Sequence, residues 1–241
     1  MHYDIYLQVK RTGQTQAHIP DWPGCNWQAK NPEEAMDHAE GAIACHQDWL
    51  RKYGKFCRPA SEPILPRLSQ QHISTASEGY LIGFFETERQ PVQAEEVPGF
   101  LDLMASARTE LLLLVVDLPN ETLIWQPAPK SWCIQDVLRH VAGAERWYLT
   151  RILDPTTIPR FMPCKSVWQR LENVRAVALE RLSRLNEDER SAIISDGSSE
   201  LWSARKVFRR YLEHEREHTF HIQEILSQYC QNLGSKQNPH W

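Results

Sequence analysis

Two histidines one helical turn apart, His214 and His218, are the residues of this sequence best suited to chemistry. On an α-helix each residue turns about 100°, so both share a face with the apolar residues Tyr211, Ile222 and Ile225. On or towards the opposite side lie Glu213, Arg216, Glu217, Phe220 and Gln223. An imidazole on a buried face must form hydrogen bonds or bind something else. Because side chains at i and i+4 lean the same way, the pair can hold one metal ion.

The same stretch matches H-E-x-x-H, the helix motif of zinc metalloproteases, in which Glu215 would be the general base. Outside that hypothesis we expect Glu215 to be solvated or to orient a histidine. Such proteases take a third ligand from further along the chain, usually from a later helix. Here residues 222–229 continue the same helix, and only a short tail follows them. His221 lies on the same helix and His240 in the tail, so neither is well placed to complete a three-ligand site. A third ligand must therefore come from upstream.

Long helices are the elements that must position these histidines. Apolar residues recur every three or four positions in four segments, as they do in amphipathic helices. The segments are residues 98–118, 133–153, 165–186 and 202–230. Four long helices joined by loops predict an up-and-down four-helix bundle over residues 95–241.

The second and fourth predicted helices begin alike. Trp132 and Val137 near the start of the second recur seventy positions later as Trp202 and Val207. In a two-fold-like arrangement, such helices project side chains into the same cavity. His140 lies at the edge of the apolar stripe of the second helix, and it is the one upstream histidine in a long helix of this half. It is the natural third ligand.

Residues 95–241 resemble the DinB/YfiT-like superfamily of metal-binding four-helix bundles. The resemblance rests on Trp132-x-x-x-x-Val137-Leu138-x-His140-Val141-x-x-x-Glu145 and on His214-Glu215-x-x-His218-x-x-x-Ile222. It implies that His140, His214 and His218 hold one divalent ion. It also implies chemistry with low-molecular-weight thiols, as in the S-transferases and isomerases of the superfamily. Phe220 stands where a related branch has a glutamate ligand, so a carboxylate-bound iron site is not expected.

Several side chains near the predicted ion have two interpretations. The three histidines could instead be core residues bonded to carboxylates. Glu145 lies in the apolar stripe, where it could accept from an imidazole, carry a proton, or pair with Arg146, Arg151 or Arg175. Aromatic residues that could line a substrate pocket, or simply fill the core, are Trp132, Trp147, Tyr148, Trp168 and Trp202.

The N-terminal part predicts a small α+β unit over residues 1–90. Residues 3–9 and 15–19 alternate as strands do, and Asn31-Pro32-Glu33-Glu34 begins a helix that ends at Gly54. Residues 57–78 are rich in proline and serine and predict an irregular connection, and residues 79–85 predict a last strand. Ile19-Pro20-Asp21-Trp22-Pro23-Gly24-Cys25 and the helix start resemble the HicB-like family over residues 1–60, or to 90 with the later strand. That resemblance implies a helix packed on a short antiparallel sheet.

Composition limits the partners. The 241 residues include 27 basic and 31 acidic ones, for a net charge of −4, and no basic block indicates nucleic acid. The six cysteines are scattered, and no segment predicts a leader or a membrane span. We expect a cytoplasmic protein. Phe220 lies opposite the buried stripe, where it gains nothing in a monomer, so we also expect a homodimer.

The predicted fold class is α+β, with a HicB-like unit followed by a DinB-like bundle. The leading functional hypothesis is a divalent-metal enzyme, with Zn²⁺ or Ni²⁺. It would be a transferase or hydrolase that acts on a small thiol or electrophile through a metal-bound water or thiolate. The alternative is a non-catalytic interaction or regulatory protein in which the ion is structural and the HicB-like N-terminal unit binds a partner. An open cavity at the ion would favour the enzyme, and a closed four-coordinate ion would favour the alternative.

Overall fold

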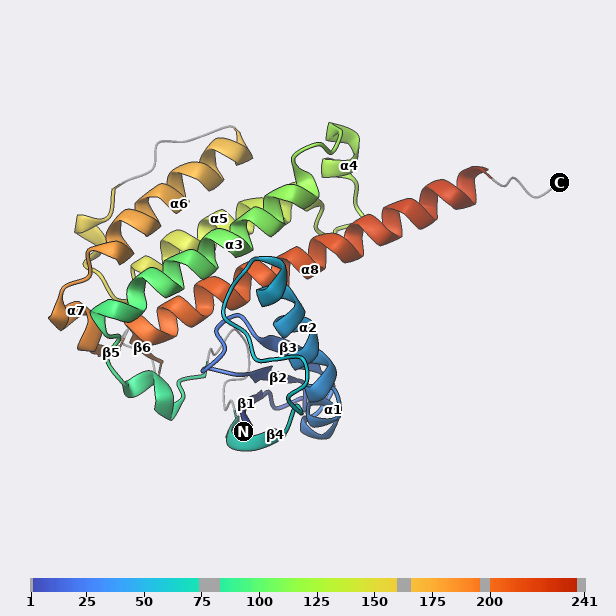
Figure 1. Cartoon of the computed structure of the whole chain (residues 1–241). Coiled ribbons are helices and arrows are strands. Elements are labelled where there is room, and N and C mark those ends of the chain that lie inside the picture. The colour runs from blue at the N-terminus through green and yellow to red at the C-terminus, as the bar shows by residue number, and fades with distance from the viewer. Residues whose placement is uncertain (1, 74–82, 160–165, 196–199, 238–241) are drawn as a thin grey trace.

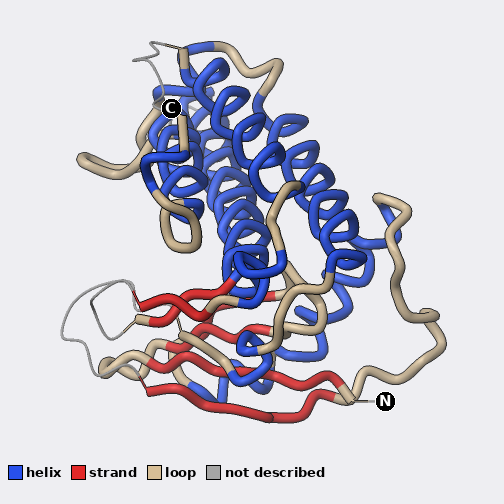
Figure 2. The backbone as a smooth tube through the Cα atoms, turned by 90° about the vertical axis from the view of Figure 1, so that its left-hand side faces the viewer, coloured by secondary structure: helices blue, strands red, loops and turns tan. Residues whose placement is uncertain are grey.

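The computed structural model describes residues 2–73, 83–159, 166–195 and 200–237, with residues 234–237 described by their backbone alone. An N-terminal sheet with its own helices lies against one side of a bundle of long helices (Figure 1). Seen from the side, the strands form one layer and the bundle another (Figure 2). The predicted α+β class is confirmed.

The N-terminal sheet has four strands in the order β3-β2-β1-β4. They are β1 (Tyr3–Val9), β2 (Thr15–His18), β3 (Asn26–Ala29) and β4 (Pro66–Ile73). The first three are antiparallel neighbours, whereas β4 runs parallel to β1. One face of β1, with Ile5 and Leu7, packs in an apolar core with Ala35, Ala39 and Ile43 of the two helices that follow β3.

Strand β4 corrects the prediction for this region. It lies within residues 57–78, which were expected to be irregular, and its parallel pairing replaces the expected purely antiparallel sheet. Pro66 is tolerated because it is the first residue of the strand. The strand expected at residues 79–85 falls partly outside the described residues, and residues 83–85 lie in no strand.

The helix predicted after β3 forms with its predicted cap. The side chain of Asn31 accepts a hydrogen bond from the backbone N–H of Glu34, and Pro32 is the first helical residue. The helix is interrupted at His38, which separates α1 (Pro32–Asp37) from α2 (Ala39–Lys52). The chain turns away at Gly54, whose φ is +62°.

All four predicted long helices form. They are α3 (Val97–Val115), α5 (Ile134–Leu149), α6 (Val167–Ser183) and α8 (Ala204–Gln237). Shorter elements are η1 (Glu86–Arg89), η2 (Ala94–Glu96), α4 (Asn120–Ile124), η3 (Pro155–Thr157), α7 (Glu187–Ser191) and the hairpin of β5 (Ile193–Ser195) and β6 (Leu201–Ser203). Trp202, expected at the start of the last helix, lies in β6 instead. Within the described part of the chain, no helix combines the length and the apolar character needed to cross a membrane.

The long helices do not alternate in direction as an up-and-down bundle requires. One core cluster joins the starts of α3 and α8 to the ends of α5 and α6, as Met104 and Val207 pack with Leu149 and Leu182. A second cluster joins the opposite ends of the same helices. Helices α5 and α6 are therefore parallel neighbours, because their ends pack together in the first cluster and their starts pack together in the second.

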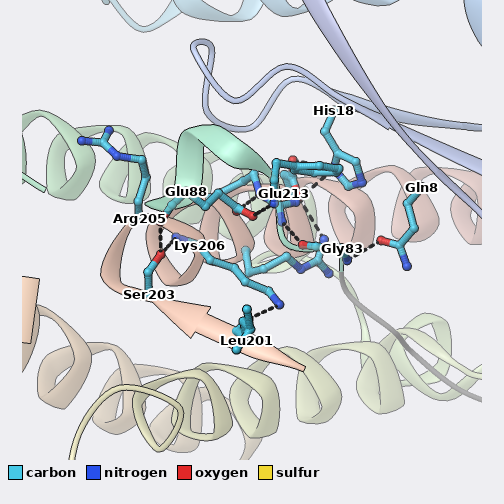
Figure 3. Close-up of polar contacts among 12 residues, drawn as sticks. Gln8, His18, Gly83, Glu88, Leu201, Ser203, Arg205, Lys206 and Glu213 are labelled. Atoms are coloured by element: carbon cyan, nitrogen blue, oxygen red, sulfur yellow. Dashed lines mark hydrogen bonds and ion pairs between the residues drawn. The ribbon is translucent and has the colours of Figure 1, made fainter. Parts of the chain in front are cut away.

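Helix α8 joins the sheet to the bundle through buried charges (Figure 3). Its Arg209 donates to Glu88 of η1 at 2.6 Å and to Glu213 at 2.7 Å. Glu213 lies 2.8 Å from Nδ1 of His18 on β2, and Arg209 also donates to the backbone oxygen of Gly83 at 3.1 Å. Removal of Arg209 would take from the buried carboxylate of Glu88 its cationic partner and from Glu213 one of two, so these contacts help to fix the sheet on α8.

Candidate metal centre

Helices α5 and α8 bring three histidines together. His214 and His218 lie one turn apart on α8, and His140 lies on the neighbouring α5. Nε2 of His214 lies 3.0 Å from Nε2 of His140 and 3.2 Å from Nε2 of His218. Among the described residues, these histidines form the one group of three or more potential metal ligands, with ligand atoms all within 4.8 Å of one another. We refer to them below as the histidine trio.

The geometry of the trio fits a divalent ion. Tetrahedral coordination at about 2.0–2.1 Å holds imidazole nitrogens roughly 3.3 Å apart, close to both observed distances. Hydrogen bonds alone do not satisfy the group, because Nε2 of His214 has one proton or one lone pair and faces two neighbours. In addition, Nδ1 of His218 is buried without a hydrogen-bond partner among the described residues.

Burial keeps the trio in the neutral form that metal binding requires. Burial, reinforced by the neighbouring His140 and His221, lowers the pKa of His218 to about 3. Burial likewise lowers the pKa of His214 well below its usual range, and it lowers the pKa of His140. At neutral pH each imidazole therefore carries a lone pair that can coordinate an ion.

Trp132, in the segment before α5, packs against the trio. Its ring centroid lies 4.9 Å from that of His140 and 6.2 Å from that of His218. His221 lies beside the same tryptophan at 6.3 Å, and 6.0 Å from His218, but it is not part of the trio. Its position fits either a packing role or a contact that orients His218.

The trio lines a cavity of about 1310 Å³ between the bundle and the N-terminal sheet. This volume exceeds the roughly 300–1,000 Å³ of most small-molecule sites. Of the five aromatic residues considered for a substrate pocket, Trp132, Trp147 and Tyr148 line it. Trp168 packs beside one bundle core cluster, and Trp202 is fully buried in the other, because it lies in β6 rather than on the helix.

Glu145 and Glu215 take part in a buried network of ion pairs. Arg175 of α6 donates to both carboxylates at 2.5 Å, and Arg108 of α3 donates to Glu215 at 2.5 Å and also to Glu145. Arg175 is one of the partners considered for Glu145 from the sequence, whereas Arg108 was not predicted. Neither glutamate is among the residues that line the cavity. Burial raises the pKa of Glu145 although both arginines oppose this shift.

The expectation that Glu215 is solvated is wrong, because the residue is 2% exposed. Helices α3 and α6 each supply an arginine to this side of α8, and those arginines bind its carboxylate. Burial opposes ionisation of Glu215, but Arg108 and Arg175 outweigh it and lower the pKa. The H-E-x-x-H match therefore has its glutamate held in ion pairs, away from the cavity wall.

A group of hydrogen-bonded polar residues lies beside His214, and it was not predicted from the sequence. Arg210 donates to the hydroxyl of Tyr148 and to Oε1 of Glu217, both at 3.4 Å. The Tyr148 ring meets His214 edge-on with centroids 5.7 Å apart, and Arg210, Tyr148 and Glu217 all line the cavity. The signal was present, because positions 210, 214 and 217 follow the spacing of one helical face.

Phe220, the basis for expecting a homodimer, also lines the cavity. It is 44% exposed, and the guanidinium of Arg216 lies 5.6 Å from its ring centroid. The residue therefore has a place within one chain, and the homodimer stays a prediction.

The model of the DinB superfamily matches residues 103–222, a range that contains the whole trio. Two solved structures are similar to this chain. TT2238, a four-helix bundle protein, is 19% identical, with a TM-score of 0.43, over 53% of this chain and 98% of its own. YfiT from Bacillus subtilis, described as a probable metal-dependent hydrolase with an unusual four-helix bundle topology, is 15% identical, with a TM-score of 0.45, over 61% of this chain and 94% of its own. No curated protein matches this chain. The family match supports the DinB-like part and leaves the N-terminal HicB-like resemblance a prediction.

Proposed function

We propose that this chain, whose helical part matches the DinB superfamily, is a divalent-metal-dependent transferase or hydrolase that acts on a small thiol or electrophile. The observation that carries the proposal is the placement of the trio. Three neutral imidazoles converge on one point, and that point lies on the wall of a cavity large enough for a substrate. Three protein ligands leave a fourth position open, as catalytic zinc sites do.

His140, His214 and His218 would hold the ion, and their neutral imidazoles suit Zn²⁺ or Ni²⁺. Bound there, the ion would lower the pKa of a coordinated water or thiol and polarise an electrophile. No carboxylate belongs to the trio, so the ion's charge would remain uncompensated by its ligands. That arrangement favours an anionic group at the open position.

The chain's own residues would bind and position the substrate. Trp132 and Trp147 offer aromatic surface to an apolar part of it, and Trp132 also packs against the ring of His140. Arg210 places a buried positive charge beside the hydroxyl of Tyr148, and both residues line the same cavity. That pair could orient an oxygen of the substrate next to His214.

The open cavity weighs against a purely structural ion, and the ion pairs of Glu215 weigh against a zinc protease. The test is to load the purified protein with Zn²⁺ or Ni²⁺ and assay it with thiol–electrophile pairs and activated esters. His214→Ala should abolish turnover and His221→Ala should retain most of it. Turnover that is equal in His214→Ala and wild type, or a protein that binds neither metal below micromolar concentration, would overturn the proposal.

A further inference from the structure

The N-terminal sheet has two unlike faces. One face forms the apolar core with α1 and α2. On the other face the strand register sets three glutamines in one row, with Gln8 opposite Gln16 and Gln16 opposite Gln28. Because side chains alternate along a strand, residues paired in this way project from the same side of the sheet. Gln8 is buried, Gln16 is half-buried and Gln28 is exposed, so the row runs from the interior of the protein towards solvent.

This glutamine row lines the same cavity as the histidine trio. Gln8 is 8% exposed and accepts a hydrogen bond from the backbone N–H of Gly83 at 2.8 Å. Gln16 donates to Oε1 of Glu217 on α8, and Asn26 donates to the same oxygen at 2.5 Å. Glu217 lies three residues from His214 on that helix, so it connects the sheet wall directly to the helix of the trio.

A buried histidine on α2, the helix that packs on the other face of the sheet, lines the same cavity. His46 is 2% exposed and lines the cavity, and neither of its ring nitrogens has a hydrogen-bond partner among the described residues. Its ring stacks on Trp49 with centroids 5.5 Å apart, which fixes its orientation. Buried polar atoms are nearly always hydrogen-bonded, so His46 is poised for a partner that enters the cavity.

We infer that the glutamine row and His46 bind the polar head group of the substrate whose reactive end meets the trio, so that the active site is shared between the sheet and the bundle. This inference rests on the proposed function. Amides and a neutral imidazole offer both donors and acceptors without net charge, which suits a head group of amides or hydroxyls, as in a peptide or a sugar.

The charges around the cavity agree with an uncharged head group. The cations that line it are Lys10, Arg210 and Arg216, and the anions are Glu200, Glu217 and Glu224. Arg210 is already paired with Glu213 and Glu217, and Arg216 donates to the backbone oxygen of Gly24. Of the cations that line the cavity, Lys10 is the one that the N-terminal sheet region contributes. A phosphate-binding site would be expected to have several cations.

The test uses the full chain loaded with Co²⁺, whose absorption reports a thiol that binds the ion. Thiols bind an accessible divalent ion whichever reaction the ion serves. Three probes are compared: 1-butanethiol without a head group, N-acetylcysteinylglycine amide with a peptide head, and 1-thio-β-glucose with a sugar head. The variants are Gln28→Ala and His46→Phe. Gln71→Ala, an exposed glutamine of β4 on the same sheet, is the matched control.

We expect wild type to bind one of the two polar thiols about tenfold or more tightly than butanethiol, and the preferred one identifies the head group. Gln28→Ala and His46→Phe should each weaken the polar thiol about three- to tenfold and leave butanethiol unchanged, while Gln71→Ala behaves as wild type. Equal binding of all three thiols by wild type would overturn this inference and leave the proposed function intact. If no thiol perturbs the cobalt spectrum, the ion is inaccessible and both proposals fail.

Discussion

Oε1 of Glu213 on α8 lies 2.8 Å from Nδ1 of His18 on β2, and both side chains are 1% exposed. A carboxylate can only accept, so Nδ1 of His18 carries the proton. Arg209 and Arg210 donate to the other oxygen of the same carboxylate at 2.7 Å and 3.0 Å. A single buried carboxylate therefore ties the N-terminal sheet to the helix that carries two of the three histidines.

A fall in pH should weaken the contacts of Glu213 with His18, Arg209 and Arg210. Burial alone would raise the pKa of Glu213, but Arg209 and His18 outweigh it and hold the pKa at about 2, below the usual 4.5. Because the folded-state pKa is the lower one, the carboxylate contributes stability fully above about pH 4.5. That contribution, up to about 3 kcal/mol, is lost as the pH falls towards 2.

Urea denaturation of wild type and Glu213→Gln at pH 7 and pH 3 measures this contribution. The difference in their free energies of unfolding should fall by about half or more between the two pH values. A difference that stays constant would mean that the charge of Glu213 is not what stabilises the fold.

Loss of any member of the trio should weaken metal binding sharply. His140→Ala, His214→Ala and His218→Ala should each lower the affinity for Zn²⁺ more than about 100-fold, because two imidazoles compete poorly with water. His221→Ala, the matched control from the same helix, should cost less than about tenfold. Isothermal titration calorimetry measures all four. If His221→Ala strips the metal and His140→Ala retains it, the trio is wrongly assigned.

Removal of the ion should leave the fold intact. The core clusters of the bundle and its buried ion pairs do not include the trio, so the chain has other means of holding α5 and α8 together. After dialysis against a chelator we expect an unchanged far-ultraviolet circular dichroism spectrum and a melting temperature lowered by a few degrees. Loss of helical structure in the apo protein would instead support a structural ion.

Glu145 should prove to be a stabilising residue. Glu145→Gln leaves Arg108 and Arg175 short of a carboxylate inside the bundle, which should cost about 3–5 kcal/mol. Glu172→Gln, at an exposed position of α6, should change stability by less than about 0.5 kcal/mol. Chemical denaturation gives both values. A Glu145→Gln protein as stable as wild type but without activity would favour the proton-carrier hypothesis instead.

Gly24 should be intolerant of a side chain because α8 lies against it. Its φ is +88°, and a Cβ there would lie 3.1 Å from Cδ of Arg216. Gly13 has nearly the same φ of +89°, but its nearest neighbour would lie 3.6 Å away, at an ordinary contact distance. In both alanine variants the positive φ costs about 1 kcal/mol of stability. A larger loss in Gly24→Ala than in Gly13→Ala would therefore measure the cost of the close contact with α8. Equal losses in the two variants would show that Arg216 moves away without cost.

The sequence alone was enough to place His214 and His218 side by side, because the helical turn of 100° per residue holds whatever the helix packs against. The same periodicity put His140 at the edge of a stripe on an earlier helix. The Asn31 cap was equally predictable, since its hydrogen bond to Glu34 is made within one turn of the chain. These features depend on neighbours in sequence.

Tertiary structure decided the surroundings of that site. Strand β4 forms because it pairs with β1, and no local sequence pattern predicts that pairing. Glu213 and Glu215 lie outside the apolar stripe of α8, yet both are buried, because the sheet covers one and α3 and α6 supply arginines to the other. Alternation along a strand tells which side is polar, but only the packing of distant segments decides whether that side meets solvent, an ion pair or a cavity.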